Sequence, residues 1–279
     1  MNVKVQAQRG ELNALFGFAE RSMHSVRRYW VWEVVWLFYS MVSVLSIGFL
    51  ASGLGTLGGN GSFDLHRTQL YLLIGSLLWG YLSLVFMEAA FAIAWERWEG
   101  TIEYTFMAPI RRVTHLMGIC LFAIGYGLVR TFVVLLAAIA MFKLDFSHAD
   151  IGAAVAVLAA STLPLIGLAI FTSVLPMVSP QKGEQMSFAV QGFLLLVSGV
   201  YYPLTVLPIP LQLAGYASPL TYALDGMRRS LLNGASLADV LPAVAILLAM
   251  GAVMIPAAVW VFSWAERRAK RLGLLKRSG

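Results

Sequence analysis

Two ionisable residues lie inside apolar stretches long enough to cross a membrane, and they are the first candidates for chemistry in this sequence. Glu88 lies in the apolar run 70–94 and Arg130 in the run 116–142. A charge at the centre of a membrane helix costs roughly 2.5–3.5 kcal/mol on insertion scales, so such side chains normally face the protein interior. We therefore expect one or both to line a substrate path. Three alternatives stay open: a direct ion pair, a Glu88 side chain that reaches the nearer interface, and an Arg130 that binds carbonyl groups.

Other catalytic constellations are absent from the sequence. It contains no Gly-x-Ser-x-Gly motif of a serine hydrolase and no Walker motif of a nucleotide-binding site. The four histidines fall in different segments without metal-binding spacing: His24, His66, His115 and His148. We therefore expect a chain that is not an enzyme and that binds no metal or cofactor of its own.

The composition indicates an integral membrane protein. Only 12% of the residues are charged and 59% are apolar, whereas soluble domains carry about 25% charged residues. The apolar runs are continuous and about 20 residues or longer, which suits membrane helices and not the short alternating strands of a barrel. The sequence predicts an all-α protein with a single transmembrane domain over residues 1–279 and membrane helices at about 30–50, 70–94, 116–142, 151–178, 186–200 and 240–264.

The fifth of these helices is followed by an unusual segment. Residues 185–224 contain no Asp, Glu, Lys or Arg, but forty residues are too few for two crossings and a turn. Prolines interrupt the second part of the block, at Pro203, Pro208, Pro210 and Pro219. We therefore predict one crossing followed by an external re-entrant element over 201–224, whose irregular backbone must be buried in protein or line a cavity.

The distribution of basic residues predicts the orientation. Fifteen of the twenty Lys and Arg residues fall on the side of the membrane where six crossings place both termini, and four fall on the other side. The positive-inside rule makes the first side cytoplasmic, in a plasma or bacterial inner membrane. Residues 11–28 repeat apolar side chains at helical spacing, which predicts an amphipathic helix in the cytoplasmic interface. The net charge of +6 then indicates contact with anionic membrane lipid and not with nucleic acid.

A charged island, residues 95–112, separates the second and third predicted helices. Three carboxylates recur at helical spacing and would share one face: Glu96, Glu99 and Glu103. Apolar side chains form a neighbouring face: Trp95, Trp98, Ile102 and Phe106. Gly100 and Thr101 interrupt the pattern, and Pro109 ends the helix before Arg111 and Arg112. Because carboxylates are unfavourable against anionic lipid, the island predicts either a docking surface for a basic protein partner or an interfacial helix with solvated charges.

Two motifs in the chain resemble those of type-2 ATP-binding-cassette exporter permeases. The first is Glu96 followed by Gly100-Thr101-Ile102-Glu103 and, later, by Pro109. The second precedes the last predicted helix and comprises Ser198-Gly199-Val200-Tyr201-Tyr202-Pro203, Leu207-Pro208, Ser218-Pro219-Leu220-Thr221-Tyr222, Asp225-Gly226 and Arg228. The six-helix layout and the interfacial helix agree with this family, so the resemblance covers nearly the whole chain.

The resemblance implies a half-transporter. A second permease chain, identical or paralogous, would complete the path, and two ATP-binding-cassette ATPase subunits would bind the ATP and magnesium. The charged island would be the coupling helix that docks into the ATPase, through Trp95, Glu96, Glu99, Gly100, Thr101, Glu103, Pro109 and Arg111. The re-entrant element would form an external gate, through Tyr201, Tyr202, Pro203, Pro208, Pro219 and Asp225.

We expect ATP-driven export of a hydrophobic or amphipathic compound, such as a drug, an antibiotic or a lipid, because few charges lie within the predicted helices. One alternative in the same family is a permease for lipid-linked glycans. An alternative from another class is a proton-coupled secondary transporter that uses Glu88. Such carriers often contain internal repeats, and none is visible here.

Overall fold

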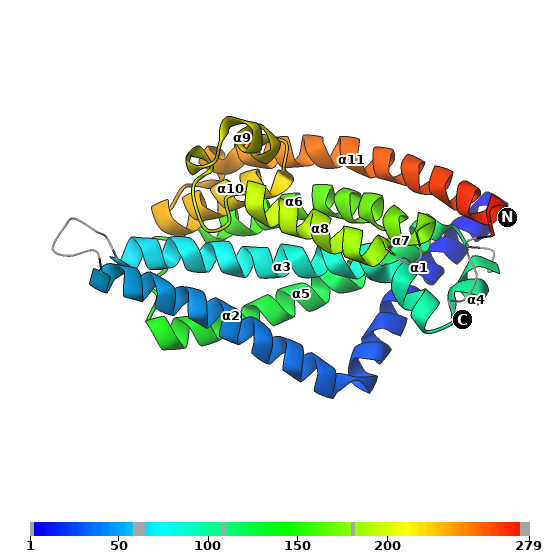
Figure 1. The fold of residues 1–279 in the computed structure, drawn as a ribbon, viewed down its shortest axis with the longest axis horizontal. Coiled ribbons are helices and arrows are strands. Elements are labelled where there is room, and N and C mark those ends of the chain that lie inside the picture. The colour runs from blue at the N-terminus through cyan, green and yellow to red at the C-terminus, as the bar shows by residue number, and fades with distance from the viewer. Residues whose placement is uncertain (1–2, 58–64, 108–109, 180–181, 274–279) are drawn as a thin grey trace.

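The computed structural model describes residues 3–57, 65–107, 110–179 and 182–273, and it contains no strand in these ranges. Figure 1 shows an elongated bundle whose long helices run roughly along its longest axis. The elements are, in chain order, α1 (Val3–Arg28), α2 (Trp30–Leu57), α3 (Leu65–Trp98), α4 (Ile102–Met107), α5 (Arg112–Phe142), α6 (Ile151–Thr172), α7 (Val174–Val178), α8 (Gly183–Val197), the 3₁₀ helix η1 (Leu204–Val206), α9 (Ile209–Tyr216), α10 (Pro219–Asn233) and α11 (Leu237–Arg271).

Among the described residues, five segments are long and apolar enough to cross a membrane. They are Trp30–Leu54, His66–Trp98, Arg112–Phe142, Ile151–Val178 and Leu237–Arg271. These segments confirm five of the predicted membrane helices as candidate spans, and several are longer than predicted. The protein is therefore an all-helical, multi-pass membrane protein.

The helix predicted at 186–200 is shorter than a full span. α8 has 15 residues, about 22 Å at a rise of 1.5 Å per residue, and a hydrocarbon core is roughly 30 Å thick. Figure 1 nevertheless shows α8 returning the chain from the α7 end of the bundle to the α9 end. The start of α1 and the end of α11 consequently lie at the same end, beside α4. A sixth crossing, made by α8 and the turn that follows it, stays a prediction.

α3 and α6 form the centre of the bundle. Their most apolar stretches are 61% buried, whereas those of α2, α5 and α11 are only 17–22% buried. α3 packs against six other helices of the bundle: α2, α5, α6, α7, α8 and α10. The flanking helices α2, α5 and α11 carry long rows of exposed apolar side chains. A helix that is apolar on all sides is covered by protein or by lipid, so these outer faces meet lipid or a second chain.

The predicted N-terminal helix is present and packs against α5. Gly118 gives α1 room to approach, because a Cβ there would lie 2.6 Å from the carbonyl oxygen of Leu15. Three large apolar side chains of α1 remain exposed: Leu12, Phe16 and Met23. This division suits a helix with protein on one side and lipid headgroups on another. Its place in the membrane interface stays a prediction.

The segment predicted as a re-entrant element, 201–224, begins with irregular backbone and then becomes helical. Its last helix runs past residue 224. η1 and α9 follow the turn after α8, and α10 continues to Asn233. Figure 1 shows α9 and α10 at the end of the bundle opposite α4. One face of α10 is buried against α6 and α3. The irregular stretch before α10 is less covered, because η1 contains no buried residue. A re-entrant position of this segment in the membrane stays a prediction.

α6 and α11 form the most extensive helix pair in the bundle, and two glycines set their close approach. A Cβ at Gly167 would lie 2.9 Å from atoms of Met254, and a Cβ at Gly251 would lie 2.8 Å from the Cβ of Leu163. Small residues at membrane helix interfaces let the backbones come close enough for extensive van der Waals contact. Each helix thus has a glycine at the point where the other helix comes closest.

We expect Gly167→Leu to destabilise the bundle, because the added side chain must push α11 away from α6. Overpacking of this kind costs typically about 1–3 kcal/mol, which should lower the melting temperature of the purified protein in detergent. Gly192→Leu is the matched control, since Gly192 lies in α8 and a Cβ there meets open space. Equal melting temperatures for the two variants would contradict the packing described above.

Candidate functional site

The charged island folds as a corner between α3 and α5. α3 ends at Trp98, and after a turn the short α4 begins at Ile102. Gly100 in this turn has a left-handed backbone with φ of 72°, which only glycine adopts without a steric penalty. The structure corrects the prediction of one helix over 95–112, because the turn at Gly100 changes the chain direction. Pro109 lies outside the described residues.

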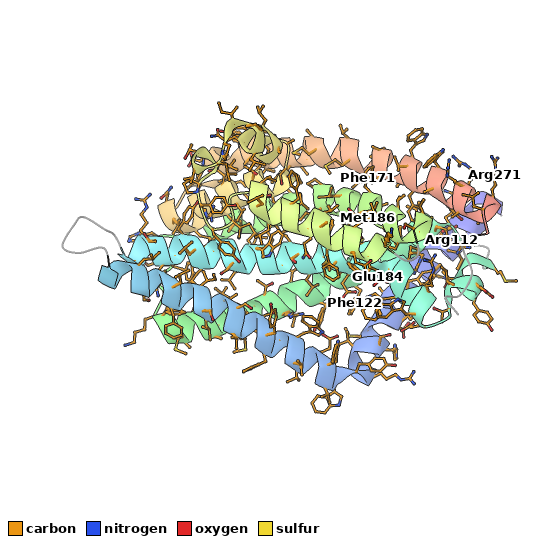
Figure 2. The ribbon with its side chains drawn as sticks, in the orientation of Figure 1. Arg112, Phe122, Phe171, Glu184, Met186 and Arg271 are labelled. Carbon is orange, nitrogen blue, oxygen red and sulfur yellow. The ribbon has the colours of Figure 1, made fainter. Side chains whose placement is uncertain are left out.

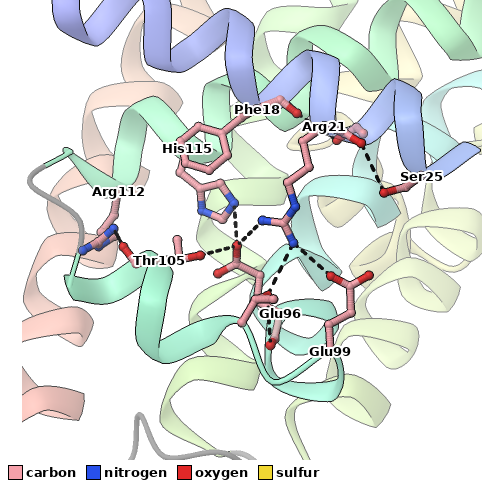
Figure 3. Close-up of polar contacts among 10 residues, drawn as sticks. Phe18, Arg21, Ser25, Glu96, Glu99, Thr105, Arg112 and His115 are labelled. Carbon is pink, nitrogen blue, oxygen red and sulfur yellow. Dashed lines mark hydrogen bonds and ion pairs between the residues drawn. The ribbon is translucent and has the colours of Figure 1, made fainter.

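The side chain of Glu96 turns inward and joins several segments (Figure 3). Its Oε1 accepts hydrogen bonds from Arg21 Nη1 at 3.0 Å and from the Thr105 hydroxyl at 2.9 Å. Nε2 of His115 lies 3.2 Å from the same oxygen, and the side chains of Glu96 and His115 are 3% and 1% exposed. A buried carboxylate is stable only where such donors offset its lost hydration. One oxygen therefore ties α1, α4 and α5 to the end of α3.

Arg21 reaches from α1 across the whole turn. Its Nη2 donates to Glu99 at 2.9 Å and to the Thr101 hydroxyl at 3.4 Å. The Thr101 N–H donates to the carbonyl of Glu96 at 2.9 Å, which closes the turn around Gly100. The side chains of Arg21 and Glu99 are 40% and 46% exposed, so the Glu99 pair is screened by water and worth about 0–1 kcal/mol. The buried Glu96 contact is the stronger of the two.

The structure separates the two faces that the sequence predicted for the island. Glu96 is buried, Glu99 is half-exposed and paired, and Glu103 is exposed. The three carboxylates therefore do not form one outward face. The predicted apolar face is also divided, because Ile102 is fully buried while Trp95 and Trp98 are exposed.

A mixed surface remains on the outside of this corner, and we call it the docking corner. Its members are exposed and combine large apolar side chains with carboxylates: Trp95, Trp98, Glu99, Glu103, Tyr104 and Met107. The two indole rings pack edge to face with centroids 5.5 Å apart. Tyr104 and Met107 are 79% and 82% exposed. The buried Glu96 network thus supports an exposed aromatic and acidic surface.

Charged groups also fix the start of α5. The backbone N–H of Arg111 donates to the Glu11 carboxylate on α1 at 3.3 Å. Arg112 donates to the carbonyl of Thr105, and its Nε lies 3.7 Å from the Glu266 carboxylate on α11. Figure 2 shows Arg112 at the end of the bundle that also holds Arg271. α11 is therefore joined to the same corner as α1.

The two intramembrane charges are not joined to each other. Arg130 donates to the Trp36 carbonyl and to the Ser40 hydroxyl on α2. Of the alternatives open for Arg130, binding to a carbonyl group is therefore the one observed. Glu88 is half-buried on α3, and no hydrogen bond or ion pair joins it to Arg130. Sequence reasoning missed a second polar contact between α2 and α5, in which the Tyr126 hydroxyl donates to Glu33.

The candidates for an external gate lie around the break between α8 and α9. The Tyr202 hydroxyl donates to the carbonyl of Leu196 at 2.6 Å. Pro219 is buried in the first turn of α10, Tyr201 is half-buried, and Pro203 and Pro208 are exposed. Asp225 differs from the others: it lies on the exposed face of α10 and pairs with Arg229 at 2.9 Å. The part of Asp225 and of the other residues in an external gate stays a prediction.

The partners of Glu96 were missed at the sequence level. Arg21 and Glu96 are 75 positions apart, and no spacing pattern in one sequence joins residues so distant. The missed members of the site are Arg21, Thr105, Arg112 and His115. The one signal available in the sequence was the arginine within the amphipathic helix 11–28. Arg21 could have been expected to seek a carboxylate in a neighbouring segment.

A comparison with family models decides the class of the protein. The family described as ABC-2 type transporter matches residues 14–232, which is most of the chain. The chain belongs to this family. The match extends from α1 to α10 and includes the Glu96 corner and the break after α8. No curated protein matches the chain.

Membership of the ABC-2 family determines the general function. The chain is an ABC-2 type permease, a membrane transport subunit whose domain carries no ATPase motif. Permeases of this family generally pair with ABC ATPase subunits. The first motif lies at the end of α3 and in α4, at one end of the bundle (Figure 1).

We expect Glu96→Ala to loosen the corner, because His115 and Arg21 would lose their shared acceptor. Breaking a buried ion pair costs about 3–5 kcal/mol, and the exposure of Arg21 puts the expected loss at the lower end of this range. The measurement is the melting temperature in detergent together with the rate of limited proteolysis within residues 99–111. Glu103→Ala is the control, since Glu103 is exposed on the same short segment. Equal losses in both variants would show that the Glu96 network does not stabilise the corner.

Proposed function

We propose that this permease is the membrane subunit of an ATP-driven exporter for a hydrophobic or amphipathic compound, and that the docking corner is where its ATPase subunit binds. The observation that carries the proposal is the contrast within the corner. It is held from within by side-chain hydrogen bonds to the buried Glu96, while its large apolar side chains are exposed. A rigid surface of this kind suits the transmission of force between subunits.

The chemistry of the docking corner favours a soluble protein partner over lipid. Aromatic residues and methionine are enriched at protein interfaces, where they fill pockets on the partner. Glu99 and Glu103 beside them would be repelled by an anionic membrane surface. We expect the docking corner to bind an ABC ATPase subunit with a basic groove. A transporter with two permease chains would bind two such subunits. ATP and magnesium would be bound by that ATPase.

The basic residues support a cytoplasmic position for the docking corner. Arg112 and Arg271 lie at this end of the bundle (Figure 2), as do the start of α1 and the end of α11 (Figure 1). Fifteen of the twenty Lys and Arg residues of the sequence belong to the segments assigned to this side, which the positive-inside rule makes cytoplasmic. We infer a plasma or bacterial inner membrane with both termini inside.

The exposed apolar faces support a second permease chain. α2, α5 and α11 are mostly uncovered within one chain, and lipid and a partner subunit would share these faces. We propose a homodimer or a pair of paralogous permeases, with the path between them. Because ionisable side chains are few along the spans, a lipophilic drug, antibiotic or lipid is favoured over a lipid-linked glycan of the same family, which would need more polar contacts.

We expect Trp98→Ala to weaken binding of the ATPase subunit, because it removes an exposed anchor from the docking corner. Co-expression of the permease with a candidate ABC ATPase subunit, followed by co-purification, measures this. The expected loss is at least about tenfold in affinity, as for truncation of a central aromatic residue in an interface. Trp260→Ala is the matched control, since Trp260 on α11 is 69% exposed and Trp98 is 63% exposed. Undiminished co-purification of the Trp98 variant would refute the assignment of the docking corner.

We expect transport to depend on ATP and not on a proton gradient. In proteoliposomes with the ATPase, a lipophilic fluorescent dye and a fluorescent phospholipid serve as probes of the two favoured substrate classes. Glu88→Gln removes the proton-accepting carboxylate, and we expect it to leave ATP dependence unchanged. Transport that survives ATP depletion but stops with a protonophore, and that fails in Glu88→Gln, would support the proton-coupled alternative.

A further inference from the structure

Arg228, on α10, is enclosed by the break after α8 and by the outer end of α3. Its Nη1 donates to the carbonyl of Gly199 at 2.9 Å, and its Nη2 donates to the carbonyl of Val200. The guanidinium also lies over the Tyr71 ring of α3, 3.5 Å from the ring centroid. The neighbouring Asp225 pairs with Arg229 on the exposed face of α10. The hydrogen bonds of Arg228 thus go to backbone carbonyl groups, and its guanidinium lies on an aromatic ring.

The two carbonyl groups that Arg228 binds come from a backbone that has left the helix. α8 ends at Val197, and Gly199 has a left-handed backbone with φ of 70°. Ser198, Gly199 and Val200 are buried, so their polar backbone groups lack water as a partner. Unpaired buried carbonyls are unfavourable. The planar fork of a guanidinium can reach both carbonyls at once, which a lysine ammonium does less well.

α3 is shaped to accept this contact. A Cβ at Gly75 would lie 2.7 Å from Nη2 of Arg228 and would collide with the carbonyl of Val200. The break, Arg228 and α3 therefore meet at one point. From Gly75, α3 continues without interruption to Glu96, a distance of about 32 Å at 1.5 Å per residue. The same helix thus carries the Arg228 contact at one end and the docking corner at the other.

We propose that Arg228 is the positioning residue that fixes the break 198–203 to the outer end of α3, so that a displacement of α3 at the docking corner moves the break. The first part, that Arg228 fixes the break, rests on the contacts described above. Its use in transport rests on the proposed function. The two statements can be tested separately, because the first needs neither an ATPase nor a substrate.

The test uses the reactivity of a cysteine in the break. Val200→Cys is placed in the full chain in liposomes and labelled with a membrane-impermeant maleimide. Val200 is fully buried, and the native Cys120 is also buried, so the background labelling is low. We expect Arg228→Gln to raise the labelling rate about tenfold, which corresponds to a shift of about 1.4 kcal/mol in a local opening equilibrium.

The neighbouring arginine provides the control. Arg229→Gln removes the same charge from the exposed face of α10, and we expect it to leave the labelling rate unchanged. Arg228→Lys should give an intermediate rate, since an ammonium can replace part of the hydrogen bonding. Tyr71→Leu should raise the rate moderately by removing the aromatic face. If Arg228→Gln does not fold, the last two variants provide the measurement.

An unchanged labelling rate in the Arg228 and Tyr71 variants would overturn the proposal, as would an equal increase in Arg229→Gln. For the transport step, Arg228→Gln is combined with the ATPase in proteoliposomes containing the lipophilic dye. We expect ATP hydrolysis to persist while dye transported per ATP falls severalfold. If the cysteine becomes reactive but no ATPase binds the chain, the placement of the break stands and the proposed function fails.

Discussion

A single buried oxygen, Oε1 of Glu96, holds one end of this bundle together. Donors from α1, α4 and α5 converge on it, and a carboxylate buried without them would be unfavourable by several kcal/mol. α4 has six residues, too few for a stable helix by itself. It keeps its shape because Thr105 and Ile102 are anchored at this corner. The exposed residues Tyr104 and Met107 are thus carried by a short helix that is anchored through a buried carboxylate.

The long helices could be predicted from the sequence because an apolar run of about 20 residues has few other stable arrangements in a membrane. The inward orientation of the Glu96 side chain could not be predicted from the sequence. Its spacing from Glu99 and Glu103 fits one helical face, and only the left-handed backbone of Gly100 shows that the face is broken. The motif was recognised, but the division of its residues between a buried support and an exposed surface required the structure.

At the end of the bundle that holds α9 and α10, the contacts also could not be predicted from the sequence, but for a different reason. The charge-free block and its prolines predicted irregular backbone, and this is found in the break after α8 and in η1. Arg228, by contrast, was named as a member of the second motif without any partner. Its partners are backbone carbonyls, which every residue possesses and no sequence pattern displays. Asp225 was expected in the gate because it belongs to the motif; the structure pairs it with Arg229 on an exposed face of α10, and its place in a gate stays a prediction.

α1 and α2 are joined by one residue, Tyr29. α1 packs on α5, while α2 leaves the joint along the bundle at a steep angle (Figure 1). Membrane helices change their tilt when the thickness of the bilayer changes. Because the joint is so short, α2 cannot tilt without pulling on α1, which carries Arg21 to Glu96. A change in the tilt of α2 would therefore be passed through Tyr29 to α1 and to the Arg21–Glu96 contact.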